Sequence, residues 1–154
     1  MTDAENAPLK IAIADATKGA MKAREKERLA VLRLIGAELK RVEVDERKTL
    51  SDDDIIAILT RMRKQRQDSH KQYQDAGRDD LAGQEAYEIE IVESFLPQPL
   101  SAEELDAAIA SAIADAGATE PKDMGKVMGL LKQRVAGRAD LGKVSGLVKG
   151  RLAG

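Results

Sequence analysis

The chain has 154 residues, enough for one ordinary domain or two small ones, and its hydrophobic share of 43% allows a core. It has no cysteine, which excludes disulfides, thiolate chemistry and cysteine-bound zinc. Although the formal net charge is only −2, eight basic residues stand against two acidic ones from Pro121 onward, and this surplus indicates an anionic partner for the C-terminal part.

The kind of apolar residue predicts an all-α fold. Leu, Ile, Val, Ala and Met supply nearly all of the apolar residues, and the only Phe and Tyr residues are Phe95, Tyr73 and Tyr87. Aliphatic side chains with abundant Ala and charge suit closely packed helices, and strand-like alternation appears nowhere.

Apolar residues at helical spacing predict two helices in the first fifty residues. The first is expected to open at Pro8 and to be weakened at Gly19, with Leu9, Ile13 and Met21 on its apolar face. The second is expected from about Glu25 to the charged run 45–48. Its apolar positions share one face: Leu29, Leu32, Ile35, Leu39 and Val42.

Ser51 and Asp54 form a capping-box pattern that predicts the start of a third helix. Its apolar face is expected at Ile55, Ile58, Leu59 and Met62. Residues 63–72 are polar, so the helix either projects past the core there or lies on a polar neighbour.

A fourth helix is expected after Gly77, which breaks the chain, with Asp79 or Asp80 as its cap. Its apolar positions are Leu81, Ile89, Val92, Phe95 and Leu96. Prolines at 97 and 99 cannot continue a helix. We therefore expect an N-terminal helical domain over 1–96, a linker over 97–100 and a small three-helix tail domain over 101–154.

The expected tail domain has clear helix boundaries. Ser101 and Glu104 form a second capping box, and this helix is expected to stop at Gly117. Pro121 is expected to begin the next helix and Gly137 to end it. Asp140 is expected to cap the last helix.

The last two helices contain an internal repeat, MGKVMGLLKQR over 124–134 and LGKVSGLVKGR over 141–151. In each, aliphatic residues form one stripe, and these are Met124, Val127, Met128, Leu131 and Val135, then Leu141, Val144, Val148 and Leu152. The opposite side, which we name the glycine–lysine face, comprises Lys122, Gly125, Lys126, Gly129, Lys132, Gly142, Lys143, Gly146 and Lys149.

Glycine in a helix interior costs about 1 kcal/mol relative to Ala, and with Gly150 there are five such glycines. A face without side chains lets another backbone approach closely, and flanking lysines suit a phosphate chain. The alternative is that the glycines pack on each other or on another helix. The residues alone leave both interpretations open.

Other candidate sites are weaker. The run Arg61, Arg63, Lys64, Arg66 and Lys71 could contact nucleic acid, but its acidic neighbours favour a solvated face. His70 is the only histidine and has no second His or Cys nearby, which argues against a metal site. Outside the lysines, it is also the only base that a serine nucleophile could use. No nucleotide-binding loop is present, so we expect no catalytic residues and no cofactor.

Several segments together resemble the YqeY-like proteins of the GatB/YqeY family over essentially the whole chain. They are Leu29–Leu34, Lys64–Ser69, Ala76–Leu81, Phe95–Leu100, Asp123–Met128, and Gly137–Asp140 running into Val144, Val148 and Lys149.

The resemblance implies a helical N-terminal region and a tail domain shared with the B subunit of glutamine-dependent Asp/Glu-tRNA amidotransferase, where the tail is regarded as contacting tRNA. Related modules occur on some glutaminyl-tRNA synthetases. The family label is therefore often carbon–nitrogen ligase with glutamine as amido donor, but the B subunit's ATP-dependent catalytic body has no counterpart here. The resemblance adds Arg138 to the glycine–lysine face as a tRNA-contacting residue.

The preferred hypothesis is a non-catalytic, translation-associated accessory protein that contacts tRNA phosphates through its C-terminal helices. A partner-dependent amidotransferase component and a protein–protein interaction module are the alternatives. An aminoacyl-tRNA synthetase or an amidotransferase subunit is a candidate protein partner, whereas DNA and membranes are not expected. Since the acidic start of the chain is followed by no long apolar run, we expect no signal peptide and a cytoplasmic location.

Overall fold

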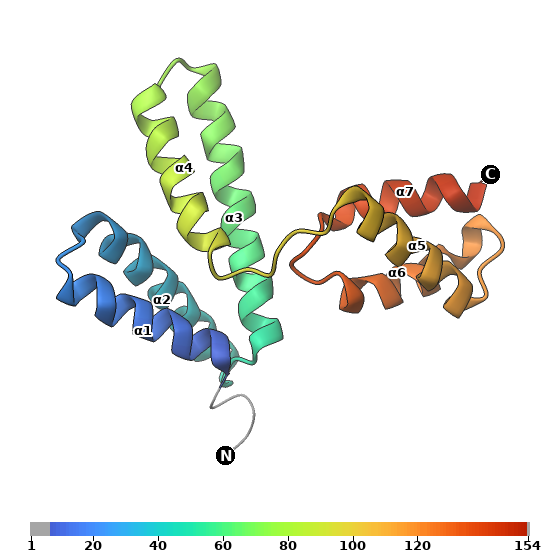
Figure 1. Cartoon of the computed structure of the whole chain (residues 1–154), viewed down its shortest axis with the longest axis horizontal. Helices are drawn as coiled ribbons and strands as arrows, with labels where there is room; N and C mark the ends of the chain where they lie inside the picture. Colours follow the sequence, from blue (N-terminus) through green and yellow to red (C-terminus); the bar gives the residue numbers. More distant parts are fainter. Residues whose placement is uncertain (1–6, 154) are drawn as a thin grey trace. The chain divides into compact units, whose positions relative to one another are not determined.

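The computed structural model describes residues 7–153, which form seven α-helices, one short 3₁₀ helix and no strand (Figure 1). This confirms the all-α fold class. The chain divides into two compact units between Leu96 and Pro97. Within the described range, no helix combines the length and the apolar character that a membrane span requires.

The first unit contains two pairs of helices. Helices α1 (Pro8–Lys22) and α2 (Lys26–Glu46) lie side by side, and so do α3 (Asp52–Asp75) and α4 (Asp79–Glu93) (Figure 1). Aliphatic side chains from all four helices and from Leu50 build one core, and they include Ile13, Ala20, Val31, Leu32, Ile35, Leu39, Val42, Ile55, Ile58, Leu59, Met62, Ile91 and Val92.

One predicted core position of α1 is wrong. Met21 is 52% exposed, whereas Ala20 is buried in the same turn. At 100° per residue, Ala20 lies within about 20° of Ile13, while Met21 is rotated about 80° away from it. The helix also continues through Gly19 to Lys22.

The third helix begins as predicted, with a capping box. The Ser51 hydroxyl accepts a hydrogen bond from the Asp54 N–H at 3.2 Å, and the Asp54 carboxylate accepts one from the Ser51 N–H at 3.0 Å. The Ser51 N–H, followed by Lys48 and the Ser51 hydroxyl, holds the pKa of Asp54 below its usual value. The box thus satisfies two backbone groups at the helix start.

The polar half of α3 lies against α4. Arg66 of α3 faces Glu88 of α4, with 3.8 Å between Nε and Oε1, and both side chains are largely buried. Burial raises the pKa of Glu88, although the Arg66 charge opposes the shift. Of the two predicted arrangements, the polar neighbour is therefore the one observed.

The start of α4 differs from the prediction. Arg78 occupies the capping position and makes no side-chain capping hydrogen bond, although its guanidinium donates to the Asp80 carboxylate. Asp79 and Asp80 belong to the first turn. Gly77, at φ +70°, ends α3 and turns the chain so tightly that the next helix begins at once. Phe95 and Leu96 follow the end of α4 at Glu93 and pack, partly buried, on the core.

The second unit contains α5 (Ala102–Ala116), a 3₁₀ turn (Pro121–Asp123), α6 (Met124–Arg134) and α7 (Leu141–Ala153). The Ser101–Glu104 capping box and the stop at Gly117, with φ +64°, are as predicted. The Asp140 carboxylate accepts the Gly142 N–H at 2.9 Å, which confirms Asp140 as the cap of α7. Two boundaries differ, because Pro121 opens a 3₁₀ turn and α6 ends before Gly137.

The core of the second unit follows the aliphatic stripes of the repeat. Its buried members are Leu105, Ile109, Ala112, Val127, Leu131, Val135, Val144, Val148 and Leu152. Met124 and Met128 are partly buried against it. Leu141 is the exception at 39% exposed, because it is the first residue of α7 and has no preceding helical turn to hold it on the core.

Candidate nucleic-acid interface

The five glycines of α6 and α7 face open space. Each is exposed, and a Cβ added at Gly125, Gly129, Gly146 or Gly150 would meet nothing within 4 Å. At Gly142 the added atom would meet only the capping carboxylate of Asp140, at 3.3 Å. Packing against a neighbouring helix of the same unit therefore does not explain these glycines.

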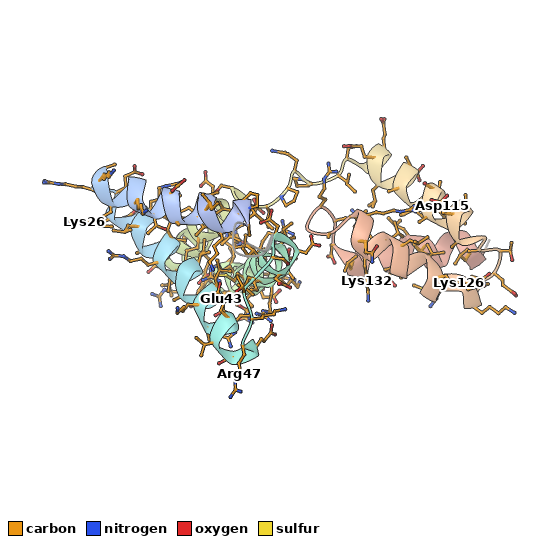
Figure 2. All side chains as sticks on the ribbon, turned by 90° about the horizontal axis from the view of Figure 1, so that it is seen from below. Lys26, Glu43, Arg47, Asp115, Lys126 and Lys132 are labelled. Atoms are coloured by element: carbon orange, nitrogen blue, oxygen red, sulfur yellow. The ribbon has the colours of Figure 1, made fainter. Side chains whose placement is uncertain are left out.

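The lysines of the same face are also available. Lys126, Lys132, Lys143 and Lys149 are exposed, and within residues 7–153 none of them has a carboxylate within ion-pair distance. Lys122 differs, because its ammonium lies 3.0 Å from Glu120. Lys126 and Lys132 are labelled on α6 in Figure 2.

The arginines of the second unit have different surroundings from the lysines. Arg134 pairs with Asp115 of α5 at 2.8 Å, and Arg151 pairs with Asp106 of the same helix. Arg138 donates from Nε to the Gln98 carbonyl at 2.7 Å. All three guanidinium groups thus hold parts of the unit together.

Arg138, the residue added by the family resemblance, is therefore engaged within the fold. Its guanidinium also lies 3.9 Å from Glu104, and its backbone carbonyl accepts the Leu100 N–H at 2.9 Å. These contacts tie the chain before α5 to the turn between α6 and α7. The other nine predicted site residues are exposed on α6, α7 or the 3₁₀ turn.

Charge is segregated within the second unit. Helix α5 supplies the carboxylates that the arginines bind, so what is left on α6 and α7 is a set of uncompensated lysines. Asp123 lies near Lys126 and Lys122. The Thr119 N–H lowers the pKa of the Asp123 carboxyl, with the Glu120 N–H, Lys126 and Lys122 as lesser causes. Its carboxylate accepts the backbone N–H groups of Thr119 and Glu120.

Sequence reasoning missed a groove between α5 and α7. Leu105, Ile109 and Leu147 contribute apolar lining, and the volume is about 250 Å³. Lys143, Arg151 and the Asp106 carboxylate that pairs with Arg151 contribute charged lining. Leu147 is 43% exposed although the neighbouring Val148 is fully buried. Only the extra aliphatic residue beside the α7 stripe could have indicated it.

The basic run of α3 is largely paired. Arg61 lies 3.5 Å from Glu38, Lys64 lies 3.2 Å from Asp68, and Arg66 faces Glu88. These ion pairs agree with the interpretation of the run as a solvated or structural face.

The fold and this surface define a helical protein with an open, basic and side-chain-poor face on its last two helices. The family model described as Yqey-like protein matches residues 10–152. The chain therefore belongs to the YqeY-like protein family. A search of curated proteins finds no match to it.

Proposed function

We propose that this chain is a non-catalytic, translation-associated protein that binds tRNA through the glycine–lysine face. The observation that carries the proposal is the coincidence, on the same two helices, of exposed glycines, four of the five with open space beside them, and exposed lysines without ion pairs. An RNA backbone can approach bare helix backbone more closely than it can approach a face covered with side chains. Each phosphate then meets a mobile ammonium group.

Composition favours folded RNA over single strands as the ligand. Proteins that hold single strands usually stack bases on aromatic side chains, and the sequence from Pro97 onward contains no Phe, Tyr or Trp. Contact through backbone shape and charge is the usual mode for structured RNA. This supports a binding mode without base readout.

The choice of tRNA rests on the resemblance to the tail of the amidotransferase B subunit. On that basis an aminoacyl-tRNA synthetase or an amidotransferase subunit is the proposed protein partner. The first unit would serve as a docking surface for it.

The proposal is tested by fluorescence anisotropy of labelled bulk tRNA titrated with the full chain at several salt concentrations. The variant K126E/K143E reverses two unpaired charges, and the matched control K40E/K71E reverses two exposed charges of the first unit that likewise have no ion pair among the described residues. The expected result is binding that weakens steeply with salt, fails in K126E/K143E and persists in the control. Equal binding by the wild type and K126E/K143E, or no binding at low salt, would overturn the proposal.

A further inference from the structure

The turn that joins α1 and α2 carries a second concentration of positive charge. We name residues 18–28 the α1–α2 tip, and it contains five basic residues against two acidic ones. Every residue from Met21 to Glu27 is exposed. Within the described range, Lys18, Lys22, Arg24 and Lys26 have no ion-pair partner, whereas Arg28 lies 4.0 Å from Glu25.

The stability of the fold does not account for Arg24. Its φ of +58° is left-handed, and the Arg24 N–H to Met21 and Glu25 N–H to Ala20 hydrogen bonds complete a helix-ending motif that favours glycine at this position. Glycine does occupy the left-handed positions at 77 and 117. An arginine here is disfavoured by its backbone conformation.

The first turn of α2 is also unfavourable for cations. Lys26 and Arg28 lie at the positive end of the helix dipole, where acidic residues are stabilising. Helices α3 and α5 follow that preference with two or more acidic residues and no basic ones in their first turns. The charges of Arg24, Lys26 and Arg28 are thus placed against local stability, although Glu27 also lies in the first turn of α2. Lys22 differs, because it lies in the last turn of α1, where a cation is favourable.

Arg47 provides a contrast within the same unit. Among residues 7–153 it is the other left-handed residue that is not glycine, with φ +51°, and it follows the far end of α2 (Figure 2). Its surroundings are acidic, since residues 43–54 contain six acidic residues and two basic ones. The same residue type and backbone conformation therefore occur once in a basic setting and once in an acidic one.

We propose that the α1–α2 tip is a second phosphate contact for the RNA that the glycine–lysine face binds. This inference rests on the proposed function and adds a binding site to it. Lys18 and Lys22 are one turn apart and share a side of α1, while Arg24 and Lys26 continue the positive charge into α2. With one basic site in each unit, one RNA bound at both sites dissociates more slowly than from either site alone.

The test compares four single variants in tRNA anisotropy titrations of the full chain. R24G removes the charge and the backbone strain together, R24E reverses the charge, and R47G and R47E are their matched controls at the acidic end of α2. Thermal melting followed by circular dichroism checks that the Tm of R24G and that of R47G are not lower than the Tm of the wild type. K126E/K143E is titrated in parallel.

We expect R24G to reduce the slope of log affinity against log salt by about 1, R24E to reduce affinity further, and both Arg47 variants to bind like the wild type. Wild-type binding by R24G and R24E, with binding lost in K126E/K143E, would overturn the second contact and leave the proposed function standing. Equal loss in the Arg24 and Arg47 variants would also overturn it. Loss in the Arg24 variants alone, with K126E/K143E unaffected, would overturn the proposed function and with it a second contact that supplements the glycine–lysine face.

Discussion

Arg134 of α6 and Asp115 of α5 form an ion pair with 2.8 Å between Nη2 and Oδ2. The equivalent residue of the repeat, Arg151 of α7, pairs with Asp106, which is also in α5. Two residues before each arginine stands an unpaired lysine, Lys132 or Lys149, which at 100° per residue points about 160° away from it. The repeat thus directs its arginines to α5 and its lysines to solvent.

This division predicts opposite effects for neighbouring substitutions. R134A should cost about 0.5 kcal/mol of stability, because the pair is partly exposed, and should change tRNA affinity little. K132A should leave stability unchanged and should reduce the slope of log affinity against log salt by about 1. Urea unfolding, monitored by circular dichroism, measures the stability of both variants, and anisotropy titration measures their tRNA affinity. The reverse pattern would contradict the division of roles.

The open glycines predict a trade-off between stability and binding. Since an added Cβ at Gly129 or Gly146 meets nothing, G129A/G146A should raise the free energy of unfolding of the second unit by about 1–2 kcal/mol. If RNA approaches the bare backbone, the same variant should bind tRNA more weakly. G83A, at an equally open glycine of α4, is the control and should stabilise without affecting binding. Unchanged affinity in G129A/G146A would show that the glycines are not the contact.

The capping box of α5 predicts a local stability effect. S101A removes the hydroxyl that accepts the Glu104 N–H at 3.1 Å, and it should cost about 1 kcal/mol. Hydrogen exchange should show faster opening of the first turn of α5 and unchanged protection in α2. Uniform loss of protection in both helices would be inconsistent with a local cap.

The capping box of α3 predicts a pH dependence. Because the folded pKa of Asp54 is lowered, its contribution to stability is complete above the unfolded value of about 3.9 and is lost as pH falls towards the folded value. The stability gap between the wild type and D54N should therefore be largest near pH 7 and should shrink below pH 4. Urea unfolding followed by tyrosine fluorescence checks it, since Tyr73 and Tyr87 both lie in the first unit. A gap that does not vary with pH would contradict the assignment.

The parts of the fold that the sequence predicts well are those determined within a few residues. Both capping boxes and the stop at Gly117 need only local hydrogen bonds and a left-handed glycine, so they can be read directly. Periodicity also identifies most of the buried positions of α2, α3, α6 and α7. It fails at Met21 and Leu141, near helix ends, because it gives the direction of a side chain and not the presence of a neighbour.

The parts that could not be predicted depend on pairs far apart in sequence. In the sequence, Arg134 and Arg138 cannot be told apart from the neighbouring lysines as candidate RNA contacts. Only the structure shows that they bind Asp115 of α5 and the Gln98 carbonyl. Glu88 is a further example, because its pairing with Arg66 places the polar half of α3 against α4 and cannot be read from the sequence of either helix. The α1–α2 tip was missed because its cations alternate with glutamates, and the left-handed backbone of Arg24 has no signature in the sequence.

Binding of tRNA at the glycine–lysine face is tested most directly by the amide spectrum of the ¹⁵N-labelled full chain titrated with tRNA. Glycine amides are well separated, so the binding surface can be located residue by residue. We expect the signals of Gly125, Gly129, Gly142 and Gly146 to shift or broaden first, while those of Gly83 and Gly117 do not. Changes at Gly83 or Gly117 with none on α6 and α7 would contradict it.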